Sequence, residues 1–196
     1  MLRYQINPHF LFNVLNTIYA LIDENAGKAK KLVIGMSEYY RYTLNKQEQT
    51  ISVEKEVAAA AKYLEIQKTR FEEKFEYEIS VDNAISGVLI PSFVIHLLIE
   101  NAVKYGTKSN SPKLIVSLVV KLINKNLLIS VSNTGKMVEA IPAGSRNTDG
   151  TGNGIENIKN RLALFYNNSY SFSLQEENGW VSATIEINNI HLPSKP

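Results

Sequence analysis

Two pairs of strands, each closed by a tight turn and separated by helical segments, restrict the fold of this chain more than any other feature of its sequence. Alternating apolar side chains predict strands over residues 75–81, 114–123, 127–131, 169–175 and 180–187. The turns Asn124-Lys125-Asn126 and Glu177-Asn178-Gly179 are typical of hairpin connections. We therefore predict an α+β fold in which a layer of helices covers a mixed, mainly antiparallel sheet.

The helices are indicated by apolar side chains at helical spacing and by the residues that cap them. The pattern predicts helices over residues 2–24, 28–44, 52–70, 91–105 and 153–166. Ser52 supplies a capping hydroxyl, and Glu54 and Glu56 place negative charge near the positive end of the helix dipole. We expect Pro91 to open the fourth helix and Gly106 to end it.

The first two predicted helices form a helical hairpin with a turn at residues 23–27. The apolar stripe of the first helix consists of Leu11, Phe12, Leu15, Ile18, Tyr19 and Ile22. That of the second consists of Leu32, Met36, Tyr39, Tyr40 and Thr43. A lone hairpin cannot bury so wide a surface, whereas two hairpins paired in a dimeric four-helix bundle can. Packing against the rest of the same chain is the alternative.

The composition excludes several classes of function. The chain has 196 residues, a formal net charge of +2 and no cysteine. The charge gives no reason to expect a nucleic-acid partner. The lack of cysteine excludes disulfides, thiolate zinc sites and cysteine nucleophiles. No apolar run approaches the ~20 residues of a membrane helix. Residues 2–5 resemble the middle of a helix without a cap, so we expect a fragment of a longer protein.

A histidine stands directly after a proline in the segment 5–13, which reads Q-I-N-P-H-F-L-F-N. Pro8 in a helix interior removes a backbone hydrogen bond and kinks the chain, which makes the surroundings of His9 unusual. Asn13 lies four residues after His9 and so shares its face of a helix. A histidine among apolar residues is also typical of a packed core, and this is our interpretation of His96; we place His191 in the tail.

Two further motifs follow in a fixed order. Residues 99–106 read I-E-N-A-V-K-Y-G, and residues 150–162 read G-T-G-N-G-I-E-N-I-K-N-R-L. Together with the first motif they resemble the catalytic half of a bacterial sensor histidine kinase of the LytS-like (autolysin-sensor) type. The resemblance extends from about Leu2 to about Ile187. It implies a phosphoacceptor hairpin at residues 1–48, a GHKL-type ATP-binding α/β sandwich at 49–188 and a tail at 189–196.

The second motif offers the groups that Mg-ATP requires. Magnesium prefers oxygen ligands, and Asn101 has a side-chain carbonyl for its coordination shell. Lys104, one turn along, can meet a phosphate as a point charge. Glu100 can serve as a general base or orient a water. The resemblance implies that Asn101 is the metal ligand and that Lys104 and Tyr105 line the nucleotide cleft. The alternative is an ordinary amphipathic helix.

The glycines of the third motif precede a helix. Gly150, Gly152 and Gly154, with Thr151 between them, let the backbone approach a phosphate, to which the helix N-terminus presents unpaired N–H groups. A plain connector is the alternative. Arg161 later in this helix either assists nucleotide binding or pairs structurally with an acid. Residues 134–150 resemble the ATP lid of the family, which closes when nucleotide binds.

The match to the family is weakest at residues 131–137. The usual motif there has an aspartate followed by N-G-x-G, and that aspartate accepts a hydrogen bond from the adenine amino group. Asn133 takes its place here and remains an acceptor, although a neutral acceptor is weaker than a charged one. Gly135 is present, but the second glycine is absent and Met137 lies nearby. This departure concerns nucleotide affinity rather than the fold.

The resemblance implies an ATP-dependent protein-histidine kinase. His9 is the expected nucleophile, and the phosphoryl group then passes to an aspartate of a response regulator. Asn13 matches a position at which related kinases orient water. We expect a homodimer, with ATP and Mg²⁺ as cofactors, in the cytoplasmic part of an inner-membrane sensor whose membrane spans are missing here. The alternatives are a non-catalytic dimeric signalling module with a degenerate nucleotide site and a GHKL ATPase that does not phosphorylate itself.

Overall fold

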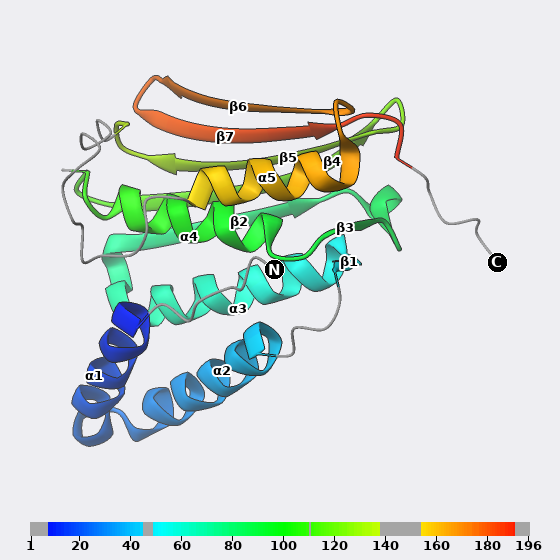
Figure 1. The fold of residues 1–196 in the computed structure, drawn as a ribbon. Helices are drawn as coiled ribbons and strands as arrows, with labels where there is room; N and C mark the ends of the chain where they lie inside the picture. The colour runs from blue at the N-terminus through cyan, green and yellow to red at the C-terminus, as the bar shows by residue number, and fades with distance from the viewer. Residues whose placement is uncertain (1–7, 45–48, 110, 138–153, 191–196) are drawn as a thin grey trace.

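The computed structural model describes residues 8–44, 49–109, 111–137 and 154–190 and shows the predicted α+β fold (Figure 1). The helices are α1 Pro8–Glu24, α2 Ala26–Leu44, α3 Val53–Phe71, α4 Val94–Gly106 and α5 Gly154–Tyr166, with short 3₁₀ turns at Glu72–Lys74 and Asn83–Ile85. The strands are β1 Thr50–Ser52, β2 Phe75–Val81, β3 Leu89–Pro91, β4 Leu114–Ile123, β5 Asn126–Thr134, β6 Tyr170–Glu177 and β7 Trp180–Ile187.

The larger sheet is mixed and mainly antiparallel, as predicted. Its strand order is β2-β4-β5-β7-β6, and only β2 and β4 run parallel. Both predicted hairpin turns are confirmed by their backbone angles. Asn124 and Lys125 have φ values of 49° and 69°, and Asn178 and Gly179 have 51° and 78°. Positive φ at both central residues matches the right-handed twist of the flanking strands.

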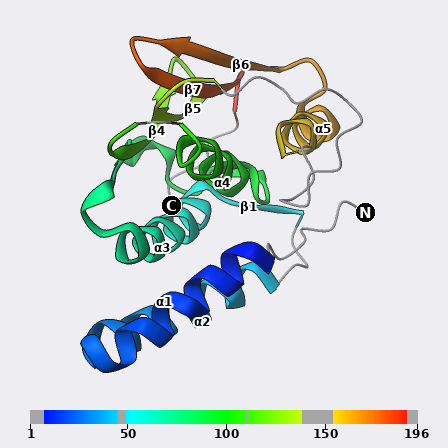
Figure 2. The same ribbon diagram turned by 90° about the vertical axis from the view of Figure 1, so that its left-hand side faces the viewer.

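The helices α3, α4 and α5 lie on one face of this sheet, and the hairpin α1–α2 lies on the far side of α3 (Figures 1 and 2). Alternate residues of β4 and β5, such as Val116, Leu118, Ile129 and Val131, point into the core beneath the helices. Serines and threonines occupy the opposite face, where the Ser132 and Ser182 hydroxyls lie 2.8 Å apart. This polar and apolar alternation places the core on one side of the sheet.

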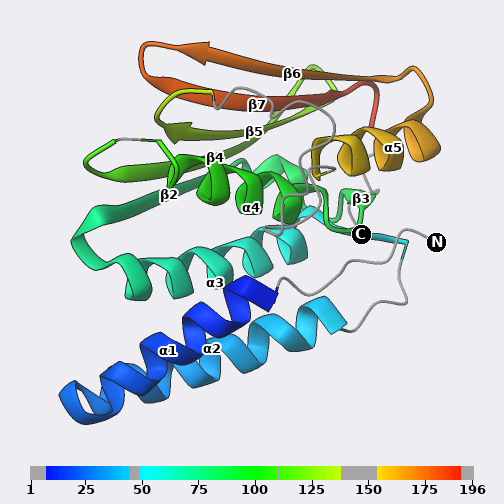
Figure 3. The same ribbon diagram turned by 60° about the vertical axis from the view of Figure 1, so that its left-hand side comes forward.

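The helical hairpin is tighter than predicted, because a single residue joins α1 to α2 (Figure 3). The N–H of Asn25 donates to the Leu21 carbonyl, and its side-chain Oδ1 accepts from the N–H of Lys28 at 3.0 Å. Asn25 therefore ends one helix and caps the next. The predicted kink at Pro8 cannot be located, since residues 1–7 lie outside the described residues.

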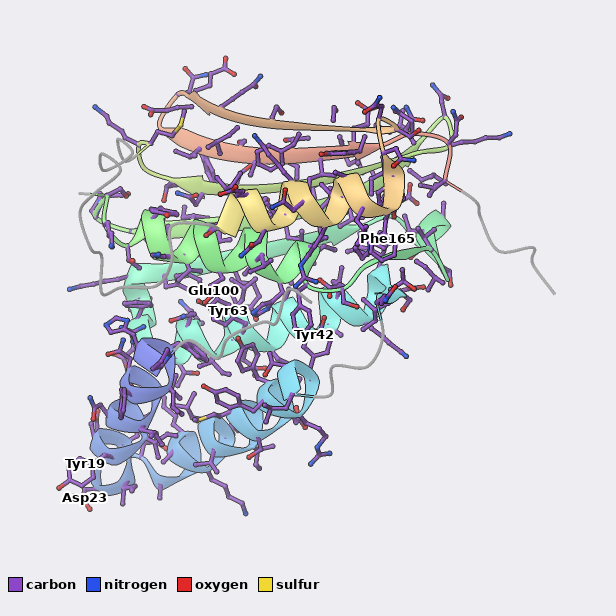
Figure 4. The ribbon with its side chains drawn as sticks, in the orientation of Figure 1. Tyr19, Asp23, Tyr42, Tyr63, Glu100 and Phe165 are labelled. Carbon is purple, nitrogen blue, oxygen red and sulfur yellow. The ribbon has the colours of Figure 1, made fainter. Side chains whose placement is uncertain are left out.

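The first helix has two apolar faces, and the predicted stripe is the outer one. Phe10, Val14 and Leu21 are buried against the rest of the chain. By contrast Phe12, Leu15, Tyr19 and Ile22 are 64%, 45%, 80% and 54% exposed. Figure 4 shows Tyr19 pointing away from the molecule at the end of the hairpin far from the sheet. Four of the six residues of the predicted apolar stripe are thus exposed in this chain, whereas Leu11 and Ile18 are half-buried and Ile18 packs against the core.

The start of α4 and the strand before it differ from the prediction. Pro91 ends the short strand β3 instead of opening α4, which begins at Val94 after Phe93 in a left-handed conformation. The two-stranded sheet of β1 and β3 was not predicted, because three-residue strands carry no periodicity. At the start of the expected tail, the N–H of Ile190 donates to the Lys125 carbonyl at 3.0 Å. Residues 191–196 lie outside the described residues.

The proposed division of the chain at residue 48 falls within residues 45–48, which also lie outside the described residues. It stays a prediction. No described helix meets the length and hydropathy of a transmembrane span.

Candidate functional site

His9 lies in the first turn of α1 with its side chain exposed. The Asn13 amide nitrogen is 3.2 Å from both ring nitrogens of His9, which confirms that the two residues share a helix face. Phe10, the next residue, turns inward and packs its ring 5.3 Å from that of Tyr39 and 5.0 Å from that of Tyr63. The buried phenylalanine therefore anchors the turn from which the histidine projects to solvent.

Asn101 lies on α4 and faces the first residue of α5. A Cβ placed on Gly154 would lie 2.7 Å from Asn101 Oδ1 and 2.8 Å from its Nδ2. Only glycine therefore permits the start of α5 to approach the Asn101 amide this closely. The Asn101 Nδ2 is buried and has no hydrogen-bond partner among the described residues. The second and third motifs, which are 53 positions apart at these residues, thus meet in space.

The Asn101 amide fits the oxygen ligand that a magnesium ion requires. Its Oδ1 lies at the start of α5, 2.7 Å from a Cβ placed on Gly154, and is the atom that would ligate the metal, whereas Nδ2 is a donor. Mg²⁺ usually takes only one or two protein ligands and completes its shell with phosphate and water. Among the residues that the structure describes, no group of three or more His, Cys, Asp or Glu side chains could hold a metal ion.

Glu100 faces a different side of α4 from its neighbour Asn101. Its charge acts on Tyr40 of α2, Tyr63 of α3 and His96 of α4, and Figure 4 shows Glu100 on the side of α4 that faces Tyr63. Burial raises the pKa of the Tyr63 hydroxyl, and the Glu100 charge adds to the rise. Burial lowers the pKa of His96, with Glu100 acting in the opposite direction. Glu100 thus lies toward the hairpin that carries His9.

Lys104 and Tyr105 follow one turn beyond Asn101. Both are half-buried, and the Lys104 Nζ lies 5.3 Å from the centre of the Tyr105 ring. A cation above an aromatic face is attracted by the negative face of the ring. Since Lys104 lies three positions after Asn101, its side chain is on the same side of α4. The predicted positive charge is therefore placed beside the predicted metal ligand.

Asn133 is buried near the end of β5, beside the C-terminus of α4. Its Nδ2 donates to the Thr134 carbonyl at 3.0 Å and would lie 3.2 Å from a Cβ on Gly106. Gly135 has φ +129°, and a Cβ there would collide with the Ser109 hydroxyl at 2.3 Å. A Cβ on Gly106 would also lie 2.4 Å from Leu114 Cδ1 on β4, so the end of α4 and the segment after β5 both approach their neighbours at glycines. Asn101, the predicted magnesium ligand, lies on α4, and Asn133, the predicted adenine acceptor, lies beside the last residue of the same helix.

Three of the predicted phosphate-binding residues, Gly150, Thr151 and Gly152, lie outside the described residues, as does most of the predicted lid. Gly154 is described and begins α5, as expected for a glycine segment that opens a helix. Arg161 donates from Nη1 to the Ser92 carbonyl at 3.1 Å, and its guanidinium lies 5.9 Å from the centre of the Phe93 ring. This favours the structural interpretation of Arg161.

The sequence interpretation missed the role of Glu56. It was predicted to interact with the dipole of its own helix, but its buried carboxylate accepts hydrogen bonds from the first turn of α4. Burial raises the pKa of Glu56, and the hydrogen bonds from Tyr42, Phe93, His96 and Ile95 oppose that rise. The sequence contained one signal for this role, since Glu56 occupies an apolar position of α3 between the buried Val53 and Ala60.

Comparison with known proteins identifies relatives along nearly the whole chain. Residues 1–75 match the family model described as histidine kinase. The sensor protein LytS of Staphylococcus saprophyticus is 33% identical over 96% of this chain, which spans 34% of that protein. The sensor histidine kinase BtsS of Escherichia coli is 26% identical over 95% of this chain, which spans 32% of its length. The chain therefore spans about a third of these curated relatives.

Solved structures match the fold. The catalytic domain of the histidine kinase ThkA aligns with a TM-score of 0.55 at 14% identity, covering 71% of this chain and 96% of that domain. A structure titled a bacterial phosphotransferase aligns with a TM-score of 0.52 at 14% identity over 90% of this chain and 88% of its own. At such low identity these matches show the fold alone, and they agree with a GHKL-type sandwich.

Proposed function

Since the chain belongs to the histidine kinase family, of the LytS-like sensor type, we propose that it phosphorylates itself on His9 from Mg-ATP. The phosphoryl group then passes to an aspartate on the receiver domain of a response regulator. The observation that carries this proposal is the meeting of Asn101 with Gly154, which brings the two nucleotide-binding motifs together. His9 and its neighbour Asn13 supply the exposed acceptor on the same chain.

The nucleotide would occupy the side of α4 that carries Asn101 and Lys104. Asn101 would hold the magnesium ion, which when bound neutralises charge on the phosphates. Lys104 adds a positive charge for a phosphate oxygen, with Tyr105 beside it. The segment Gly150, Thr151, Gly152 and Gly154 would bring backbone N–H groups to the phosphates. Asn133 would accept from the adenine amino group, and Gly135 would let the chain pass close to it.

The acceptor chemistry follows from the exposed imidazole. One neutral ring nitrogen of His9 attacks the γ-phosphorus, the bond to the bridging oxygen breaks, and ADP leaves. The Asn13 amide, 3.2 Å from the ring, orients the imidazole and later a water for removal of the phosphoryl group from the partner. Glu100, which faces the hairpin, serves as the proton acceptor or orients a water. Transfer requires the nucleotide-binding part to swing onto the hairpin.

The exposed stripe of α1 supports a homodimer. Phe12, Leu15, Tyr19 and Ile22 form an apolar face on one side of the helix, which a second hairpin would cover in a four-helix bundle. We expect light scattering at tens of micromolar to give a dimer for the wild type, and substitution of Leu15→Lys to weaken it. A monomeric wild type at that concentration would contradict this part of the proposal.

We further propose that residues 1–48 form the phosphoacceptor part, 49–188 the ATP-binding part and 189–196 a tail. The chain would then be the cytoplasmic portion of an inner-membrane sensor, attached to the membrane only through segments outside this sequence. Its partners would be the receiver domain and a second copy, with no role for nucleic acid.

Incubation with γ-labelled Mg-ATP tests the central claim. We expect label that is stable to base and labile to acid on the wild type, and none on His9→Gln. Asn101→Ala should bind Mg-ATP about 10- to 150-fold more weakly and lose labelling, whereas His9→Gln should still bind nucleotide. Label that persists on His9→Gln would refute the assigned site. Nucleotide binding without label on either protein would instead indicate the ATPase alternative if ADP accumulates, and a non-catalytic module if it does not.

A further inference from the structure

The carboxylate of Glu56 caps a helix other than its own. Glu56 lies on α3 and is fully buried. Its Oε1 accepts from the N–H of Phe93 at 2.6 Å, and its Oε2 accepts from the N–H groups of Ile95 and His96 at 3.2 and 3.3 Å. Phe93, the residue before α4, makes no side-chain cap of its own. The first turn of α4 therefore depends on a carboxylate from α3 for its unpaired N–H groups.

The helical hairpin reaches the same carboxylate. The Tyr42 hydroxyl, from the last turn of α2, donates to Glu56 Oε1, and the Tyr42 ring lies 5.5 Å from the Phe93 ring. One turn earlier, the Tyr39 hydroxyl lies 3.0 Å from His96 Nε2 in a buried contact. Figure 4 shows Tyr42 in the space between α2 and α3. Two tyrosines of the hairpin thus contact the start of the helix that carries Asn101.

The helix after the glycine segment approaches from the other side. Burial lowers the pKa of Arg161 on α5, and the charge of Glu56 opposes that change, which places the two groups near one another. Arg161 also donates to the carbonyl of Ser92, two residues before α4. The same α5 begins at Gly154 against Asn101. Elements from the hairpin, from α4 and from α5 therefore converge around one buried carboxylate.

We propose that Glu56 is a positioning residue through which the helical hairpin sets the placement of Asn101 relative to Gly154. Asn101 lies eight residues after Phe93 on one helix, about 12 Å along its axis. A tilt of the first turn of α4 is therefore transmitted to Asn101. A buried carboxylate that loses a hydrogen-bond donor raises the free energy of the folded protein. The hairpin therefore favours orientations in which Tyr42 still donates to Glu56, and Glu56 in turn holds the first turn of α4 in one position. The inference rests on the proposed function only for the role given to Asn101.

Tyr42→Phe tests the proposal because it removes a single hydroxyl. The matched control is Tyr40→Phe on the same helix, since the Tyr40 hydroxyl has no hydrogen-bond partner among the described residues. Site-resolved amide hydrogen exchange on the full chain without nucleotide reports on α4 and α5 directly. We expect Tyr42→Phe to speed exchange about five- to tenfold from residues 93–96 through Asn101 and at the start of α5. Tyr40→Phe should leave these amides unchanged.

A second variant and a second readout separate positioning from simple loss of packing. Glu56→Gln should affect the same amides, and adding Tyr42→Phe to it should have little further effect, because both act through one contact. Tyr42→Phe and Glu56→Gln should each weaken Mg-ATP binding by a similar factor. The proposal would be overturned if Tyr42→Phe changed exchange only in α2, or if Tyr42→Phe and Tyr40→Phe changed it equally. Both outcomes can be read even if Glu56→Gln fails to fold. Since exchange is measured without nucleotide, the result does not depend on whether His9 accepts a phosphoryl group.

Discussion

Replacement of Gly154 by alanine should disable the nucleotide site without harming the fold. The new Cβ would lie 2.7 Å from Asn101 Oδ1, about 0.7 Å inside the 3.4 Å at which ordinary contact begins. The Asn101 amide must therefore move, or the start of α5 must withdraw from it. Magnesium coordination tolerates neither, because Mg²⁺ requires ligand oxygens at about 2.0–2.1 Å in near-ideal octahedral geometry.

The expected loss of Mg-ATP affinity follows from the free energy that one interaction of the Asn101 amide with a charged partner contributes. Such a bond contributes about 1.5–3 kcal/mol, which corresponds to about 10- to 150-fold weaker binding of Mg-ATP. The fold should not weaken, since Gly154 does not have the positive φ that alanine avoids. The clash falls on the end of the Asn101 side chain, which can move, and the restriction of the unfolded chain by alanine, about 0.4–1 kcal/mol where nothing clashes, offsets it. The variant should thus bind poorly while remaining at least nearly as stable.

Calorimetric titration with Mg-ATP and thermal unfolding without it measure the two effects separately. Gly35→Ala on α2 is the matched control, because its Cβ would meet only Ile66 at 3.7 Å. It should gain similar stability and bind normally. In the double variant with Asn101→Ala, the Gly154→Ala change should have little further effect on affinity. Wild-type affinity in Gly154→Ala would refute the assignment of Asn101 and Gly154 to one site.

Three further predictions concern the buried groups around the site. Burial lowers the pKa of His96, so the unfolded chain binds a proton below about pH 6.5 that the folded chain does not. Stability should therefore fall on acidification through that pH, and urea unfolding should show a smaller fall for His96→Gln. Phe10→Ala should lower the free energy of unfolding by about 3–5 kcal/mol, since Phe10 is 4% exposed between the rings of Tyr39 and Tyr63; an unchanged urea midpoint would contradict the anchoring role. Asn133→Asp should bind adenine nucleotides more tightly yet lose about 1–3 kcal/mol of stability, because it removes the donor to the Thr134 carbonyl. Titration and unfolding of the same sample would check both signs.

The sequence predicted the sheet almost residue by residue because its strands alternate cleanly. β2, β4 and β7 have the bounds that were expected, and both hairpin turns lie at the residues predicted for them. Pro91 was misplaced because proline is equally compatible with the first turn of a helix and with a short edge strand. The sequence alone does not decide between them, since the choice depends on the pairing of β3 with β1.

The site was predictable only as far as motif residues share a helix. His9 and Asn13, or Asn101 and Lys104, are placed together by helical periodicity alone. The approach of Gly154 to Asn101 and the opposite orientation of Glu100 depend on how α4 is rotated against α5 and the hairpin. No local pattern encodes that rotation, because every turn of α4 carries apolar residues and the helix is buried on several sides.

The buried Glu56 explains why α4 starts at Val94 and not at Pro91 as predicted. If the helix began at Pro91, no acceptor would be needed for the N–H of that residue, since proline has none. The observed start at Val94 leaves N–H groups that must be satisfied, and a carboxylate from α3 satisfies three of them. Three features therefore belong together, because all of them set where α4 begins: the strand β3, the left-handed conformation of Phe93 and the buried acid of α3. Its consequence is that the start of α4 is held by contacts from α3 and, through the Tyr42 hydroxyl, from the hairpin.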